Sequence, residues 1–381
     1  MEKMNIFQIM GCTSDQYASL EHYLVLKAKI CRENGSGFVV AYNNIPASRD
    51  FINDLLNQGA ILEKLEANSI LNLAFHIKFF RIVKKYKIDV LHAYFAPTRH
   101  YAVFLAWLFG VKRRYRQAAN LPLSGKRKSG LKFRIFLLRH RILASFASKY
   151  ICRSVAVRNE YLEMGIKSEK LSVADGGADI EKYKKFEVSK EELLDFYPGV
   201  NRMIIGTASR LVKEKGIPTL VESIAKLKKE FNIVCLILGE GPEMETLIRV
   251  IKNNELKDHV KLLGHKNELE KYYNILDVYV SPSFSEGMSN SVLEAMACEV
   301  PVVLSDIEPN KEIIRVAQNQ GLYVGELFKV GDPEDLYIKL RSLLEKNNKV
   351  EIGKNARKII ADNFSINHRI SKEFEIYKMQ N

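Results

Sequence analysis

The chain has 381 residues, of which 47% are hydrophobic and 27% charged. This length gives room for two or three domains with sizeable cores, and the composition excludes a disordered or collagen-like chain. Lys and Arg outnumber Asp and Glu by 58 to 45, a net charge of +13. We therefore expect an anionic partner: nucleic acid, phosphates or an acidic membrane surface.

The cysteines and the longest apolar run bear on the compartment. The five cysteines are scattered and form no CxxC pair, which argues against a disulfide framework or structural zinc and favours the cytoplasm. The longest uncharged apolar run, Tyr101 to Val111, is far shorter than the roughly 20 residues that span a bilayer. We expect a cytoplasmic chain that does not cross a membrane by itself.

Short β-branched runs alternate with helical patterns, which predicts an α/β fold with parallel sheets built from βαβ units. The expected strands of the first half are Met4–Met10, Gly37–Tyr42, Ile61–Leu65, Asp89–His92, Arg113–Arg116, Ser148–Ala156 and Leu171–Val173. Those of the second half are Met203–Ala208, Ile233–Leu238, Val260–Leu263, Val278–Val280, Val302–Leu304 and Leu322–Val324. Two separate doubly wound sheets follow.

A turn-rich, charged stretch separates the two halves. It begins near Asp175-Gly176-Gly177 and continues to Gly199 with few apolar clusters. We predict a first domain over residues 1–180, a linker over 181–200 and a second domain over 201–363. The remaining residues, 364–381, have a helical pattern.

The positive charge is concentrated between Val111 and Asn159, where fourteen Lys and Arg residues occur and no Asp or Glu. The cations extend from Lys112 to Arg158, and between Leu131 and Phe146 they interleave with apolar side chains. This pattern favours a basic amphipathic helix in an anionic membrane interface. The alternatives are a solvated face of a core-packed helix and a nucleic-acid groove, although no nucleic-acid-binding signature is present.

Ligands of doubly wound sheets bind at the carboxyl ends of the strands, so we expect the binding residues in the loops there. Neither a P-loop nor a complete GxGxxG occurs. Arg210 follows the strand ending at Ala208, and Lys215 precedes the helical run that starts at Ile217. An Arg fork and a Lys point charge ahead of a helix can converge on a diphosphate; the alternative is a pair of solvated cations.

A second loop follows the strand Val278–Val280. Glu286 lies in the loop and Glu294 in the helix after it. Backbone N–H groups of Gly287, Met288, Ser289 and Asn290 can form an anion-binding nest between them. For Glu294 an alternative stays open, since Ser291-Val292-Leu293-Glu294 also reads as a capping box.

The order and spacing of several motifs identify a resemblance. They are Arg210-Leu211 through Lys215-Gly216, Gly239-Glu240-Gly241-Pro242, Leu263-Gly264, Ser281-Pro282-Ser283, Glu286 to Ala297 and Pro301-Val302-Val303. Together they resemble retaining glycosyltransferases of family 4, over roughly residues 200–315. The resemblance implies the GT-B fold: two Rossmann-like doubly wound domains facing across a cleft.

The resemblance also implies roles for the domains and for individual residues. The domain over 1–180 would bind the acceptor, the one over 201–363 the nucleotide-sugar donor, and the helix over 364–381 would cross back to the first domain. Arg210 and Lys215 would bind the diphosphate, Glu294 the ribose hydroxyls, and Glu286 the sugar hydroxyls, helped by N–H groups at Gly287, Met288, Ser289 and Asn290.

Three further residues complete the expected site. His265 lies where the family seats the nucleotide base, and Gly11 begins the first loop of the donor-binding wall. His92 would end a first-domain strand and contact the sugar or the acceptor; for His92 and His265 a purely structural role is the alternative. One departure is Tyr17-Ala18, which replaces the usual Gly-Gly of the first loop.

The expected chemistry needs neither metal nor cofactor. No DxD motif occurs, and fixed cations can stabilise the leaving diphosphate in a metal's place. The resemblance favours front-face attack with retention, while inversion by a general base stays open.

We therefore expect a glycosyltransferase that uses a UDP-linked sugar and a lipid-linked glycan acceptor in bacterial surface polysaccharide synthesis. It would be peripheral on the inner face of the cell membrane. The alternatives are a soluble transferase acting on a small metabolite and a non-enzymatic basic module for nucleic acid.

Overall fold

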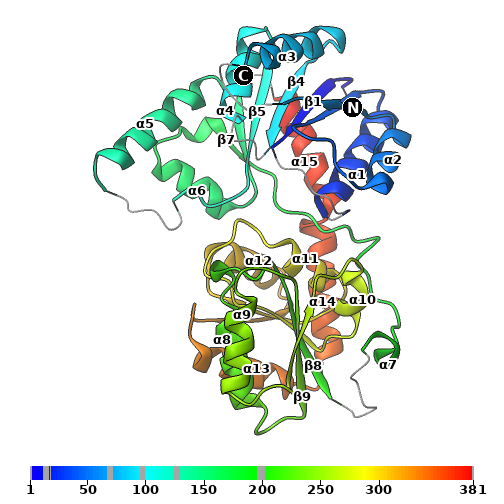
Figure 1. Cartoon of the computed structure of the whole chain (residues 1–381), viewed down its shortest axis with the longest axis vertical. Helices are drawn as coiled ribbons and strands as arrows, with labels where there is room; N and C mark the ends of the chain where they lie inside the picture. The colour runs from blue at the N-terminus through cyan, green and yellow to red at the C-terminus, as the bar shows by residue number, and fades with distance from the viewer. Residues whose placement is uncertain are drawn as a thin grey trace. The chain divides into compact units, whose positions relative to one another are not determined.

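The computed structural model describes residues 2–11, 17, 19–66, 72–94, 99–123, 129–194 and 202–379. The chain divides into two compact units (Figure 1). The first comprises Met1–Asp175 and Arg369–Asn381, and the second Gly176–His368. Each unit has its own parallel sheet.

The sheet of the first unit has the strand order β3-β2-β1-β4-β5-β6-β7. Its strands are β1 Asn5–Met10, β2 Gly37–Tyr42, β3 Ile61–Lys64, β4 Val90–Tyr94, β5 Arg113–Ala118, β6 Lys149–Cys152 and β7 Leu171–Val173. The helices of this part of the chain are α1 Ser19–Glu33, α2 Arg49–Asn57, α3 Leu73–Lys85, α4 Arg99–Leu108, α5 Leu131–Ser145, α6 Val155–Glu163 and the 3₁₀ turn η1 Ser168–Lys170. Helix α15, Ile366–Lys378, joins the unit from Arg369 onward.

The second sheet has the order β10-β9-β8-β11-β12-β13. Its strands are β8 Met203–Ala208, β9 Ile233–Leu238, β10 Val260–Gly264, β11 Val278–Ser281, β12 Val302–Ser305 and β13 Gly325–Phe328. The helical segments are α7 Lys190–Leu193, η2 Lys213–Lys215, α8 Ile217–Leu227, α9 Met244–Asn253, α10 Leu269–Asn274, α11 Asn290–Ala297, α12 Glu308–Asn319, α13 Pro333–Leu344 and α14 Lys349–Asn363. The strand order reverses at β8, between β9 and β11, which makes the carboxyl ends of β8 and β11 the switch point of the sheet.

Two predicted strands differ most from the observed bounds. The strand expected at Leu322–Val324 is β13, three residues later, because Leu322 N–H still donates to Ala317 at the end of α12. The strand expected to reach Ala156 ends at Cys152. Ser154 stops it by accepting a hydrogen bond from Val157 N–H, so it caps α6 instead.

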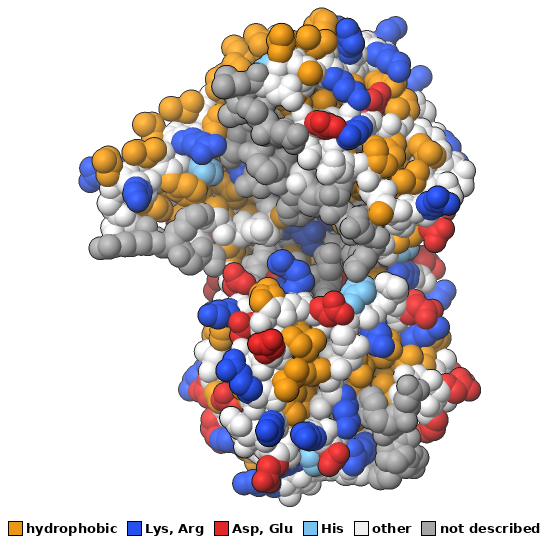
Figure 2. Space-filling view, in the orientation of Figure 1, with side chains coloured by type: hydrophobic (Ala, Val, Ile, Leu, Met, Phe, Trp, Pro, Cys, Tyr) orange, Lys and Arg blue, Asp and Glu red, His pale blue; other side chains and the backbone are white. Residues whose placement is uncertain are grey.

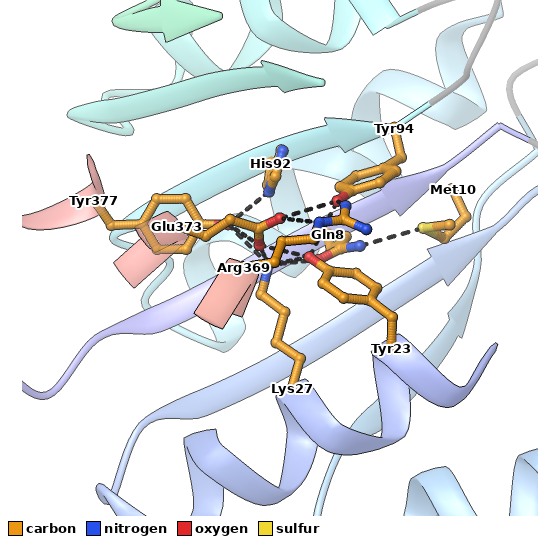
Figure 3. A network of polar contacts seen from close by, with 9 residues as sticks. All are labelled: Gln8, Met10, Tyr23, Lys27, His92, Tyr94, Arg369, Glu373 and Tyr377. Carbon is orange, nitrogen blue, oxygen red and sulfur yellow. Dashed lines mark hydrogen bonds and ion pairs between the residues drawn. The ribbon is translucent and has the colours of Figure 1, made fainter. Parts of the chain in front are cut away.

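A buried polar network ties α15 to the sheet of the first unit (Figure 3). Lys27 Nζ lies 2.8 Å and Arg369 Nε 3.2 Å from the Glu373 carboxylate, and Tyr23 donates to it at 2.6 Å. Burial alone would raise the pKa of Glu373, but Lys27 and Arg369 hold it well below its usual range. The carboxylate is therefore the counter-charge for two cations inside the unit.

Substituting Glu373 by Gln should destabilise the protein strongly, because Lys27 and Arg369 would stay buried without a counter-charge. We expect the free energy of unfolding, measured in urea, to fall by about 3–5 kcal/mol. Glu375 is exposed on the same helix. The control Glu375→Gln should stay within about 0.5 kcal/mol of the parent, and equal losses for both variants would contradict this account.

Candidate active site

The candidate site of the second unit lies where the loops after β8 and β11 meet. The two strands are neighbours, with Val278 opposite Ile205 and Tyr279 opposite Gly206. Their loops are joined by a hydrogen bond from Phe284 N–H to the Glu214 carbonyl, at 2.8 Å. The parallel sheet thus brings together two loops that are some seventy residues apart in the sequence.

Lys215 and Glu286 form an ion pair across this junction. Both side chains are mostly buried, with 18% and 12% of their surfaces exposed. Ser283 Oγ donates to the same carboxylate oxygen of Glu286, at 2.9 Å. Lys215, which was predicted to bind the diphosphate, is therefore in direct contact with Glu286, which was predicted to bind the sugar.

Gly216 permits this close approach. Its φ is +60°, and a Cβ atom there would lie 2.2 Å from the Pro282 carbonyl oxygen. A side chain would therefore push the loop after β8 away from the loop after β11. The predicted helix beyond it is observed as α8.

Arg210 and His265 lie along the same edge of the sheet. Arg210 is exposed, and its neighbour Leu211 donates its N–H to the Glu240 carbonyl at 2.8 Å. His265 is also exposed; its N–H donates to the Glu240 carboxylate at 3.3 Å and its ring Nε2 lies 3.1 Å from Asn267 Oδ1. The loop after β9 therefore connects the loops that carry Arg210 and His265.

Glu294 is buried in α11, and Tyr273 donates to its Oε2 at 3.3 Å. The capping-box alternative needed Ser291 at the N-cap, but the N-cap is Ser289, so Ser291 already lies inside the helix. No side chain caps the helix at Ser289. The positive end of α11 is therefore not neutralised by a capping side chain.

The nest residues lead into α11, whose first residue is Asn290. Gly287 and Met288 are buried, whereas Ser289 and Asn290 are partly exposed. All four lie in the second unit with Glu286, Lys215 and Arg210.

His92 and Gly11 belong to the first unit. The expectation that His92 ends its strand is wrong: β4 continues to Tyr94, because its pairing with β1 extends to Met10. The ring is fully buried, and its Nδ1 lies 2.5 Å from the Tyr377 hydroxyl (Figure 3). Burial and the nearby Lys27 lower the pKa of His92 well below its usual value. Gly11 donates its N–H to the Tyr94 carbonyl at 2.9 Å.

The sequence reasoning missed the residues that support Glu286 from behind. Ser305 Oγ donates to the Ser283 carbonyl at 2.6 Å, and Asn310 Nδ2 donates to the Ser305 carbonyl at 2.8 Å. All three side chains are buried. The available signal was Ser283 in the Ser-Pro-Ser motif, but its partners come from the next strand and helix.

Within residues 2–379 and outside the gaps named above, no three His, Cys, Asp or Glu side chains gather as a metal site would need. No helix in the described part of the chain is long and apolar enough to span a bilayer.

The chain is similar to known glycosyltransferases. Residues 196–359 match the family model of glycosyl transferases group 1. The Escherichia coli UDP-Gal:alpha-D-GlcNAc-diphosphoundecaprenol alpha-1,3-galactosyltransferase is 26% identical over 313 residues, 79% of this chain and 78% of that protein. The capsular polysaccharide biosynthesis glycosyltransferase CapM of Staphylococcus aureus is 26% identical over 62% of this chain and 63% of its own. The structure of Anabaena HepE with UDP and glucose matches with a TM-score of 0.79 and 20% identity, over 98% of this chain and 99% of that one.

Substituting Gly216 by Ala should be more costly than the left-handed backbone alone explains. Gly321 has a similar φ of +69° but nothing within 4 Å of a Cβ, so it serves as the matched control. Gly321→Ala should cost about 1–2 kcal/mol of unfolding free energy. Gly216→Ala should cost about 1–3 kcal/mol more, because the methyl group meets the Pro282 carbonyl. Equal losses in urea unfolding would show that the two loops are not in tight contact.

Proposed function

We propose the donor, the acceptor and the reaction course of this glycosyltransferase, which has a GT-B fold and whose residues 196–359 match the family model of glycosyl transferases group 1. It transfers a sugar from a UDP-linked donor, with retention, to a lipid-linked glycan acceptor in bacterial surface polysaccharide synthesis. Support for the donor and the acceptor comes from the Escherichia coli relative, whose name states both. The alternative of a non-enzymatic nucleic-acid module is wrong, since the chain is an enzyme.

The observation that carries the proposal is the contact between Lys215 and Glu286 at the switch point. When a donor binds, its diphosphate replaces Glu286 as the partner of Lys215. Arg210, in an exposed loop, adds a second cation to the same diphosphate oxygens. Glu286, released from Lys215, accepts hydrogen bonds from the sugar hydroxyls. Donor binding thus exchanges one ion pair for two sets of contacts.

The charges suit the departure of the diphosphate. As the glycosidic bond breaks, the sugar gains positive charge and the leaving oxygen negative charge. Lys215, Arg210 and the N-terminus of α11 stabilise the leaving group without reorganising. We propose that they act in place of a divalent cation and that no cofactor takes part. The departing phosphate then takes the acceptor proton.

The remaining candidates receive narrower roles. Glu294 accepts from the ribose hydroxyls, with Tyr273 fixing its carboxylate, and His265 borders the base. The backbone N–H groups of Gly287 to Asn290 help Glu286 to bind the donor sugar. We propose no contact between His92 and the substrates, because its ring is fully buried and hydrogen-bonded to α15. Gly11 stays a candidate for the donor-binding wall.

Helix α5 favours a membrane-bound acceptor over a small soluble metabolite. At about 100° per residue, its four large exposed apolar side chains fall within about 60° of one another. They are Leu131, Ile135, Leu138 and Ile142, each more than half exposed. Cations border this stripe on both sides, Lys132 and Arg139 on one and Arg134 and Arg141 on the other.

The opposite face of α5 packs against the core of the first unit through Phe133, Phe136 and Leu137. The helix therefore presents its second apolar face, with its basic borders, to the outside (Figure 2). This is the pattern of a helix lying in an anionic membrane interface. We propose that α5, at the centre of the segment from Lys112 to Arg158, holds the enzyme on the inner face of the cell membrane. Lys126, Arg127 and Lys128 of that segment lie outside the described residues.

Variants of the ion pair should separate donor binding from transfer. Lys215→Ala should weaken UDP affinity by roughly tenfold to a hundredfold, the loss of one charge-assisted contact. Glu286→Gln should abolish transfer yet keep or raise UDP affinity, because Lys215 loses its competing carboxylate. Calorimetry with UDP in the presence of a chelator and a transfer assay with UDP-sugars measure the two effects.

The matched control is Lys213→Ala, an exposed cation in the same turn. It should leave UDP affinity and transfer close to those of the parent. Unchanged UDP affinity in Lys215→Ala, or normal transfer in Glu286→Gln, would refute the assignment of that residue. Loss of UDP binding on adding chelator would refute the metal-independent reaction.

Replacing Ile135 and Leu138 by Gln should release the enzyme from vesicles of phosphatidylcholine and phosphatidylglycerol. Each inserted side chain contributes about 1.5–3 kcal/mol, so partitioning should fall by at least about tenfold. Trp107, the single tryptophan, is half-exposed on α4 with its ring 5.1 Å from that of Phe146 at the end of α5. Its fluorescence should shift to shorter wavelength when the parent binds.

The control Val350→Gln removes an even more exposed apolar side chain from α14 in the second unit and should leave partitioning unchanged. Parent-like vesicle binding by the α5 variant would contradict the membrane role of this helix.

A further inference from the structure

A pocket of about 350 Å³ lies beside the end of α5 in the first unit. Its lining includes Arg141, Ala144, Ile166, Lys167, Glu169 and Lys170. Three cations and one carboxylate thus surround a cavity whose remaining walls are largely apolar. Neither the proposed donor site nor the proposed membrane helix explains it.

The pocket is on the opposite edge of the sheet from the loops expected to bind substrates. Helix α6 starts at the carboxyl end of β6, capped by Ser154, and runs back to Glu163. Residues 165–170 follow it and lead into the amino end of β7 at Leu171. In a parallel sheet the substrate loops gather at the carboxyl edge, so this pocket is separate from them.

The Arg141 guanidinium can donate further hydrogen bonds to a ligand in the pocket. Its Nε donates to the Met164 carbonyl at 2.9 Å, which fixes the side chain across Gly165. A Cβ on Gly165 would lie 2.5 Å from Arg141 Nη2, so glycine leaves room for the guanidinium there. No acceptor among the described residues is bonded to the two terminal nitrogens.

Lys170 and Lys167 add positive charge. Lys170 Nζ donates to the Ala147 carbonyl at 2.5 Å, and burial together with nearby Arg114 lowers the pKa of Lys170. Lys167 and Glu169 are exposed, and Lys167 Nζ lies 3.6 Å from Glu169 Oε1. This one carboxylate also acts on Lys170, so it offsets part of the charge of three cations. The net charge of the lining is positive, and a bound anion would relieve the repulsion among the cations.

The place of Arg141 on α5 connects the pocket to the apolar stripe. Arg141 is one of the cations that border the stripe, next to Ile142 in the sequence. A headgroup beside a membrane-inserted α5 therefore lies within reach of the guanidinium, while Ala144 and Ile166 provide a surface for its carbon atoms.

We propose that this pocket binds the phosphate group of an anionic phospholipid headgroup, held by Arg141, Lys167 and Lys170. The proposal rests on the proposed membrane association of α5. It adds a specific lipid site to a surface that otherwise acts through diffuse charge and apolar insertion. A bound headgroup would fix the orientation of the first unit on the bilayer.

The test compares two double variants of the full chain that remove the same charge. Arg141→Gln with Lys167→Gln changes the pocket, and Lys3→Gln with Lys29→Gln changes exposed cations elsewhere in the unit. On phosphatidylcholine vesicles containing phosphatidylglycerol, the pocket variant should partition at least about tenfold more weakly than the parent. The control should stay within about twofold. Equal losses would overturn the pocket and leave diffuse attraction.

A third variant, Arg141→Lys, separates the positive charge of Arg141 from its hydrogen bond to the local backbone. It keeps the cation but gives up the bond from Nε to Met164, so it should retain most vesicle binding. A loss as large as that of the double variant would show that Arg141 matters only for the local fold, and would overturn the lipid assignment. Circular dichroism confirms that each variant is folded.

Soluble probes separate this proposal from the membrane role of α5. Glycerol phosphate should raise the melting temperature of the parent but not of the pocket variant, even if the parent fails to bind vesicles. No shift with glycerol phosphate would overturn the pocket while leaving α5 untouched. An equal shift with inorganic phosphate, combined with pocket-independent vesicle binding, would assign the site to free phosphate and overturn the lipid headgroup.

Discussion

The candidate active site depends on one topological constraint: β8 and β11 are neighbours in a parallel sheet although their sequences are far apart. Every parallel strand delivers its following loop to the same edge, so Lys215 and Glu286 meet without any local sequence signal. Gly216 makes the contact close, and the Ser283, Ser305 and Asn310 side chains hold it from the next strand and helix. The geometry of the site is therefore a property of the second sheet.

The first unit uses buried charge for a different purpose. Lys27, Arg369 and Glu373 are enclosed where α15 meets the sheet, and the hydroxyls of Tyr23, Tyr94 and Tyr377 complete their hydrogen bonding. Such a network costs desolvation, and removing one partner would leave a buried charge without its counter-charge. It fixes the C-terminal end of the chain to a unit whose other residues all come before Gly176.

Local patterns predicted the two parallel sheets and most strand positions, because β-branched runs between helical segments are a property of neighbouring residues. These patterns failed where a contact between residues far apart in the sequence determines the end of a strand or helix. His92 reads as the last residue of its strand, but pairing with β1 carries β4 on to Tyr94 and encloses the ring. Glu294 reads equally as a cap or a ligand, and only the start of α11 at Asn290 removes the capping box. The pocket beside α5 combines residues from α5, the loop after α6 and η1, and it has no motif.

The ion pair between Lys215 and Glu286 affects which anions can bind at Lys215. An ammonium already neutralised by a carboxylate attracts free inorganic phosphate weakly, since breaking the pair would strand Glu286 in a mostly buried position. In the proposed reaction, a nucleotide sugar offers hydroxyls to Glu286 while its diphosphate pairs with Lys215. On the proposed function, the pair therefore favours a ligand that carries both groups over inorganic phosphate, which carries only one.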